Sequence, residues 1–147
     1  MTRGQIAIIT KSKVMTSIEF NGDMYMPSGK WGGHGRKVIN ALKRVYDVAT
    51  YMYEVAKFNK DNHHYNDIDR LTYKMGLETL DFTKGYFDNW FSDYVYIKNN
   101  TQEIVKIITN VCDKDGNDIG KKEVELKPKD IAVLCFGSLE QLVETDE

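Results

Sequence analysis

The sequence predicts an α+β fold in which one antiparallel sheet packs against two or three helices. Two observations predict this fold: β-rich runs occupy the beginning and the end of the chain, and a helical pattern of apolar residues lies between them. The chain has 147 residues, of which 41% are hydrophobic and 29% are charged. This size and composition are typical of one globular domain, residues 1–147, which can bury a core without disulfides.

The N-terminal residues predict a β-hairpin. Residues 5–10 are mainly apolar, residues 14–20 alternate between apolar and polar, and a short polar turn joins the two runs. Asn21 and Gly22 then mark a second turn, because this pair readily adopts the left-handed backbone that tight turns need. Residues 24–26 extend the sheet by a third strand, which Pro27 ends.

A long helix is predicted over residues 36–59. Apolar residues recur there at helical spacing, namely Val38, Leu42, Val45, Ala49, Met52 and Ala56. This apolar face is broad, so we expect the helix to pack against the sheet and against a second subunit of a homo-oligomer. A shorter helix is predicted over residues 68–75, with Gly76 ending it, and a third over residues 82–90, with Asp81 as its cap.

The C-terminal part predicts an antiparallel meander. Its four β-like runs cover residues 94–98, 103–111, 119–126 and 130–136. Asp115 and Gly116 predict a hairpin turn between the second run and the third. We expect a last helical turn over residues 138–143. The two cysteines, Cys112 and Cys135, lie in these apolar runs and are interpreted as buried free thiols.

Charge is distributed unevenly along the chain. The net charge is −2, which does not favour binding to extended nucleic acid. Between Asp23 and Asp47 there is no acid, and five bases occur there, whereas the residues after Ser138 carry acids and no base. A basic segment in a mildly acidic protein suits a small anionic ligand. The N-terminus has no long apolar run, so we expect no signal peptide, no membrane span and a cytoplasmic location.

Residues 24–37 form the candidate site, because glycine, positive charge and large aromatics coincide there just before the predicted long helix. A helix N-terminus presents unpaired N–H groups, and a glycine-rich loop lets phosphate oxygens approach them. Cationic side chains would add charge, and aromatic rings would stack on a base or sugar. The candidate ligand-binding residues are Tyr25, Ser28, Gly29, Lys30, Trp31, Gly33, His34, Gly35 and Arg36.

This loop matches neither of the common phosphate-binding motifs. No Gly-Lys-Ser/Thr closes it, and Gly33 and Gly35 lack the third glycine of the dinucleotide-binding fingerprint. The alternative interpretation is an ordinary exposed loop with solvated bases and Trp31 folded onto the core. His63 and His64 lack further ligands at metal-binding spacing, and residues 113–117 fit a hairpin turn better than a calcium loop. The sequence therefore predicts no metal and no cofactor.

The beginning of the chain resembles a group of known proteins. Thr2-Arg3-Gly4 precedes an isoleucine-rich run, and an aromatic-Pro-x-Gly loop from Tyr25 to Gly35 precedes the helix. This arrangement is similar to the start of many small uncharacterised bacteriophage proteins, although those often carry His-Trp-Asp where this chain has Met24-Tyr25-Met26. The resemblance covers about the first forty residues. It implies a phage protein that acts as a binder in the host cytoplasm, by analogy with phage anti-defence sponges that sequester nucleotide immune signals.

These observations favour a non-enzymatic binding protein that captures a phosphate-bearing, nucleotide-like molecule. Two alternatives remain open. The first is a protein–protein inhibitor of a host enzyme that uses the aromatic residues 82–91 or the acidic C-terminus. The second is an N-terminal-nucleophile hydrolase, in which removal of Met1 would expose the Thr2 hydroxyl beside its own amine. The sequence contains no other recognisable catalytic set.

Overall fold

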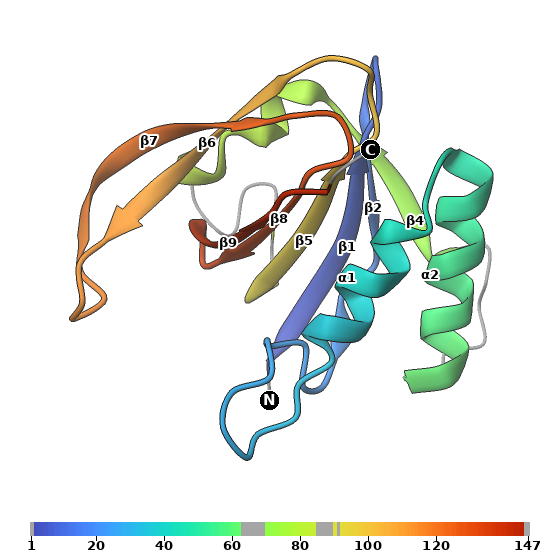
Figure 1. Cartoon of the computed structure of the whole chain (residues 1–147), viewed down its shortest axis with the longest axis horizontal. Coiled ribbons are helices and arrows are strands. Elements are labelled where there is room, and N and C mark those ends of the chain that lie inside the picture. Colours follow the sequence, from blue (N-terminus) through green and yellow to red (C-terminus); the bar gives the residue numbers. More distant parts are fainter. Residues whose placement is uncertain (1, 63–69, 85–89, 91, 146–147) are drawn as a thin grey trace.

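The computed structural model describes residues 2–62, 70–84, 90 and 92–145. Within these residues, nine strands form one sheet in the order β4-β2-β1-β5-β8-β9-β6-β7, and β3 pairs with β1 (Figure 1). The strands are β1 (Arg3–Ile9), β2 (Val14–Ser17), β3 (Phe20–Asn21), β4 (Thr72–Met75), β5 (Tyr94–Asn99), β6 (Val105–Cys112), β7 (Asp118–Leu126), β8 (Ile131–Cys135) and β9 (Ser138–Val143). The helices are α1 (Gly35–Lys43) and α2 (Val48–Asn62), with two short 3-10 segments, η2 (Leu77–Leu80) and η3 (Phe82–Lys84).

The sheet is mixed, which corrects the prediction of a purely antiparallel one. The predicted N-terminal hairpin is confirmed, because β1 pairs with β2 in antiparallel fashion. However, β1 also pairs with β5 in parallel, from Gly4 opposite Tyr94 to Ile9 opposite Asn99. The meander is wrong as well, since β8 and β9 lie between β5 and β6. Strand periodicity reports which residues share a face, but it does not report the direction of the neighbouring strand.

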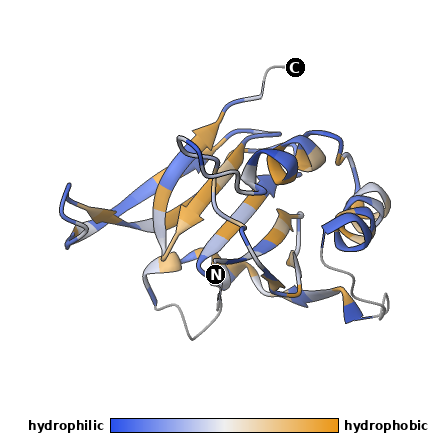
Figure 2. Cartoon of the chain, turned by 90° about the horizontal axis from the view of Figure 1, so that it is seen from below, coloured by the Kyte–Doolittle hydropathy of each residue, from blue (hydrophilic) through white to orange (hydrophobic). Residues whose placement is uncertain are grey.

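Each face of the central strands packs against a different layer. On β1, Ile6 and Ile8 belong to the core under α1 and α2, whereas Ala7 and Ile9 belong to the core on the opposite face. The hydroxyl of Tyr51 on α2 donates to the carbonyl of Ile6 at 2.6 Å, which fixes this helix on the sheet. Hydrophobic residues therefore concentrate along the central strands, and the projecting tip of the β6–β7 ribbon is mainly hydrophilic (Figure 2).

The face away from the helices is closed by β6, β7 and the two 3-10 segments. Ile107 and Leu126 pack there against Phe82 and Trp90, whose rings stack with centroids 5.2 Å apart. The indole N–H of Trp90 donates to the carbonyl of Thr79 at 2.8 Å, so its polar atom is satisfied in the buried site. Phe82 and Trp90 are therefore core residues.

The single helix predicted over residues 36–59 is two helices. α1 ends at Lys43, and α2 begins at Val48. Asp47 makes the break, because its carboxylate accepts a hydrogen bond from the Thr50 N–H at 2.8 Å while the Thr50 hydroxyl accepts one from the Asp47 N–H at 3.0 Å. This reciprocal arrangement is that of a helix N-terminal capping box. Val45 is buried and continues the apolar spacing across the break, so the sequence pattern does not reveal that the helix is interrupted.

Three other local predictions are wrong, and long-range pairing explains two of them. Residues 72–75, predicted as helix, form β4 opposite β2, and residues 138–143, predicted as a helical turn, form β9 opposite β8. Residues 24–26 form no strand. The first two residues of the helix predicted over residues 68–75 lie outside the described residues. Of the helix predicted over residues 82–90, the structure describes the 3-10 segment Phe82–Lys84 and Trp90.

Candidate functional site

The candidate loop projects from the end of the sheet where α1 begins (Figure 1). At its tip, Ser28 and Trp31 exchange two backbone hydrogen bonds of 3.0 and 2.9 Å. Gly29 lies inside this tight turn with φ +55°, a conformation that glycine adopts without strain. The turn brings Lys30 and Trp31 together, with the Lys30 amine 5.5 Å from the centre of the indole ring. The indole is 63% exposed, so the structure does not fold Trp31 onto the core.

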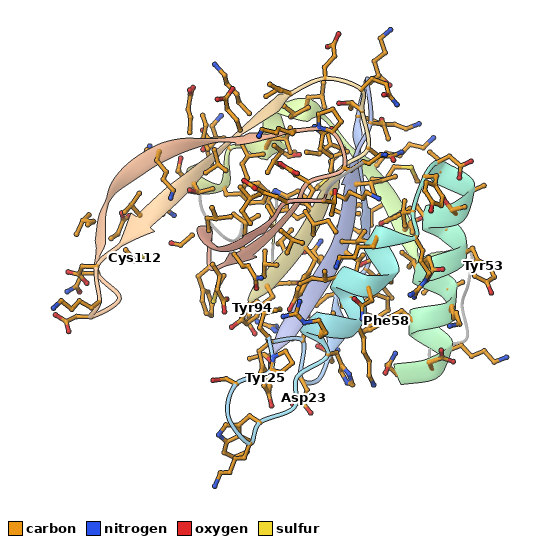
Figure 3. The ribbon with its side chains drawn as sticks, in the orientation of Figure 1. Asp23, Tyr25, Tyr53, Phe58, Tyr94 and Cys112 are labelled. Atoms are coloured by element: carbon orange, nitrogen blue, oxygen red, sulfur yellow. The ribbon has the colours of Figure 1, made fainter. Side chains whose placement is uncertain are left out.

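Backbone carbonyls of the preceding loop accept hydrogen bonds from two of the N–H groups at the N-terminus of α1. The N–H of His34 donates to the carbonyl of Asp23 at 2.6 Å, and the N–H of Gly35 donates to the carbonyl of Tyr25 at 3.1 Å. No described residue accepts a hydrogen bond from the N–H of Arg36 or of Lys37. Two of the amide donors at the start of α1 therefore remain available for an anion. Figure 3 shows Asp23 and Tyr25 at the base of the loop, beside the first turn of α1.

Two of the candidate glycines have a packing role. A Cβ atom on Gly33 would lie 1.9 Å from the carbonyl oxygen of Tyr25, and one on Gly35 would lie 2.5 Å from the hydroxyl of Tyr96. These are overlaps rather than contacts, so both positions must lack a side chain for the loop to close over the sheet. The sequence pattern suggested that these glycines give a ligand access to the backbone. In the structure, the packing of the loop explains both glycines without a ligand.

The histidine of the loop is poorly suited to carry charge at neutral pH. His34 is half-buried, and its ring lies edge-on to Phe58 with centroids 6.0 Å apart. Burial lowers the pKa of His34, the neighbouring Lys37 ammonium lowers it further, and Asp23 opposes both. The positive charge at this surface therefore comes from Lys30, Arg36 and Lys37, all of which are exposed.

The structure thus assembles part of the predicted site. Lys30, Trp31, Arg36 and the free amides are accessible from the same end of the molecule, whereas Gly33 and Gly35 are packed inside the loop. A cavity of about 350 Å³ between α1 and α2 includes Lys37 in its lining, but it also includes the carboxylates of Glu54 and Asp61. This adjoining hollow is therefore not a purely cationic one, and the candidate surface for an anion consists of the loop and the start of α1.

The structure gives little support to the alternative sites that the sequence suggested. The side-chain oxygen of Thr2 is buried and has no hydrogen-bond partner among the described residues. Phe82 and Trp90 are buried, which removes them from an inhibitory surface. Cys112 and Cys135 are free thiols, as predicted, but Cys112 is exposed and Cys135 is only half-buried. His63 and His64 lie outside the described residues.

Sequence reasoning missed a lysine in the middle of the sheet. Lys98 is the fifth residue of β5 and is only 3% exposed. Alternation along the strand was a usable signal, because it places Lys98 on the same face as Tyr94 and Tyr96. A charged residue at an inward position of an apolar strand indicates either a buried partner or a polar cavity.

Comparison of the chain with models of protein families, with curated proteins and with solved structures finds no match in any of the three. Among the described residues, no helix combines the length and the apolar character needed to span a membrane. The same residues contain no cluster of three or more His, Cys, Asp or Glu side chains that could hold a metal ion. The geometry of the loop is therefore the basis for a functional proposal.

Proposed function

We propose that this protein binds a small phosphate-bearing, nucleotide-like molecule without converting it, and that it does so at the loop 25–33 and the first turn of α1. In a phage context, such binding would sequester a nucleotide immune signal of the host. One observation carries the proposal: the exposed Lys30–Trp31 pair lies at the end of the molecule where the N–H groups of Arg36 and Lys37 lack acceptors among the described residues.

The chemistry of these groups is complementary to a nucleotide. The two amides and the helix dipole favour an anion at the start of α1, and Arg36 can bind a phosphate through two parallel hydrogen bonds. The indole of Trp31 offers a flat face on which a base can stack, an interaction worth about 1–3 kcal/mol in single-stranded nucleic-acid complexes. The surface thus combines a phosphate-binding end and a base-stacking end within one loop.

The homo-oligomer predicted from the broad apolar helix face is part of this proposal. Val48, Met52 and Tyr53 on α2 are exposed to 39%, 38% and 64%. Val48 and Met52 lie one helical turn apart, and Tyr53 follows Met52 on the outer side of α2, whereas Phe58 is directed towards α1 (Figure 3). An exposed apolar stripe of this kind suits contact with the same stripe of a second subunit.

A titration with nucleotides tests the proposal. Calorimetry with adenosine monophosphate, adenosine diphosphate and a cyclic dinucleotide should show saturable binding by the wild type. The double variant Lys30→Ala/Trp31→Ala should weaken it by at least about tenfold, which corresponds to about 1.4 kcal/mol, the range expected for loss of one stacking contact. Phosphorus spectra recorded after incubation should show unchanged nucleotide.

Lys114→Ala is the matched control, because Lys114 is equally exposed but lies in the turn between β6 and β7. The control should bind as the wild type does. Native mass spectrometry of protein purified from infected or signal-producing cells reports the subunit count and any retained ligand together. Ligand-free monomers, or nucleotide affinities that the double variant leaves unchanged, contradict the proposal.

A further inference from the structure

A cavity of about 650 Å³ lies at the opposite end of α1 from the candidate loop. Its walls come from the α1–α2 connection, the end of β5 with the loop after it, the turn between β7 and β8, and the residues that follow β9. This volume is within the range of small-molecule sites. The charged and aromatic side chains in its lining are Lys43, Tyr46, Lys98, Lys129 and Glu144.

Lys98 closes the cavity on the sheet side. Its amine donates to the carbonyls of Leu42 and Val45 at 2.8 and 2.6 Å, in the last turn of α1 and just after it. These carbonyls belong to the negative end of the helix dipole, which would otherwise repel an anion. The lysine therefore neutralises the helix end, and its ammonium has a third N–H to offer.

The cavity has more positive than negative charge. Three lysines and one glutamate line it, and none of the three lysines forms an ion pair with a carboxylate in the described part of the chain. Burial is the main cause that lowers the pKa of Lys98, to about 8, and the nearby Lys129 ammonium lowers it further. Two neighbouring ammonium groups are stabilised by a bound anion.

Lys129 is held in a conformation that disfavours its own residue type. Its φ is +76°, in the left-handed region that glycine or asparagine usually occupies. Two contacts hold the backbone there: the Lys129 N–H donates to the carbonyl of Asn99 at 2.9 Å, and the Thr145 hydroxyl donates to the carbonyl of Lys129 at 2.7 Å. These contacts fix the backbone of Lys129 where its side chain lines the cavity.

Tyr46 supplies a flat apolar wall. Its ring is 74% exposed, and its centre lies 5.9 Å from the amine of Lys98. The exposed ring can therefore stack on a planar part of a ligand whose anionic group reaches the lysines.

From the cavity, its lysines and its aromatic wall, we infer that the protein has a second binding site, which takes a small aromatic phosphate monoester between Lys98, Lys129 and Tyr46. The phosphate lies between the two ammonium groups, and the ring of the ligand lies against Tyr46. This site shares no residue with the loop 25–33 or with the first turn of α1, so it stands or falls independently of the function proposed above.

Phenyl phosphate is the probe. Inorganic phosphate and phenol test the contributions of its phosphate group and of its ring separately. In ¹H–¹⁵N spectra of the full chain, phenyl phosphate should shift the amides of Lys98, Thr101 and Lys129 in a saturable way. Inorganic phosphate should bind more weakly at the same residues, and phenol should shift none of them. Shifts confined to the amides of Arg36 and Lys37, or no saturable shift, would overturn the inference.

Lys129→Gly is the decisive variant, because glycine relieves the positive φ while it removes the charge. The melting temperature should stay the same or rise, and the dissociation constant for phenyl phosphate should increase by about fivefold or more, as expected for loss of one charge-assisted contact. Lys127→Ala is the matched control, since Lys127 is exposed in the same turn and does not line the cavity. Equal affinity of Lys129→Gly and the wild type would refute the site even if the spectra shift.

Discussion

The two ends of α1 differ in how the helix dipole and the nearby cations act on an anion. At the start of the helix, the dipole already favours an anion, and the cations around it are exposed side chains of a projecting loop. At the end, the dipole disfavours an anion, and Lys98, although buried within the sheet, donates to the carbonyls of Leu42 and Val45 and so neutralises the helix end. The proposed site at the first end depends on residues that are close in the sequence, whereas the one at the second end depends on a strand that is distant in the sequence.

The two ends also differ in how their backbones are held. The loop before α1 depends on close approach of the backbone of Tyr25 to Gly33 and of the Tyr96 hydroxyl to Gly35. The connection after α1 depends on side chains, namely the Lys98 amine and the Asp47–Thr50 capping box. Substitutions should therefore act by steric overlap at one end and by loss of hydrogen bonds at the other.

The largest effect is expected for Gly33→Ala. The new Cβ would overlap the carbonyl of Tyr25, which is backbone and cannot rotate away, so the free energy of unfolding should fall by about 3 kcal/mol. Urea denaturation measures this change, and Gly32→Ala is the matched control, because a Cβ there meets no atom within 4 Å. Equal stability of the two variants would show that the loop is not held by backbone packing.

A smaller loss is expected for Lys98→Met. Methionine preserves the apolar stem but leaves the carbonyl of Val45 without its donor, whereas the carbonyl of Leu42 keeps the Val45 N–H at 3.1 Å; one unsatisfied buried acceptor costs about 1–3 kcal/mol. We expect a decrease of about 2 kcal/mol in the free energy of unfolding. Phenyl phosphate binding should be lost while nucleotide binding at the loop persists. Loss of both ligands together would show that the two ends are not independent.

The last difference between the two ends concerns pH dependence. Lys98 faces Lys43, Lys129, Tyr46 and Glu144 across the cavity, and its pKa of about 8 lies below the ordinary value of 10.5. Between these values the unfolded chain binds a proton that the folded chain does not. The free energy of unfolding should therefore rise with pH through this window in the wild type relative to Lys98→Met.

The same deprotonation should weaken phenyl phosphate binding between pH 7 and 9, by about threefold to tenfold, because the phosphate remains a dianion while the amine loses its charge. Calorimetric titrations at several pH values measure this change. Nucleotide binding at the loop does not involve Lys98 and should keep its affinity over that range. Parallel pH profiles for the two ligands would contradict the assignment of Lys98 to one end only.

Part of the candidate site could be predicted because its cations are neighbours in the sequence. Lys30 and Trp31 are adjacent, so a turn suffices to bring them together, and Arg36 follows at the helix start. The packing role of Gly33 could not be predicted. The atom that excludes a side chain there is the backbone carbonyl oxygen of Tyr25, which comes close to Gly33 only in the folded loop. The cavity could not be predicted either, since its walls come from segments separated by many tens of residues.

The sequence by itself determined the N-terminal hairpin and the positions of β5, β6, β7 and β8, because alternation of apolar and polar residues is a local property that survives in almost any arrangement of strands. Only the tertiary structure decided that β1 lies parallel to β5, that β4 and β9 are strands, and that Lys98 reaches the carbonyl of Leu42 across 56 residues. Those features depend on which segments meet, and the free energy that decides this comes from burial and hydrogen bonding between distant residues, which local periodicity does not record.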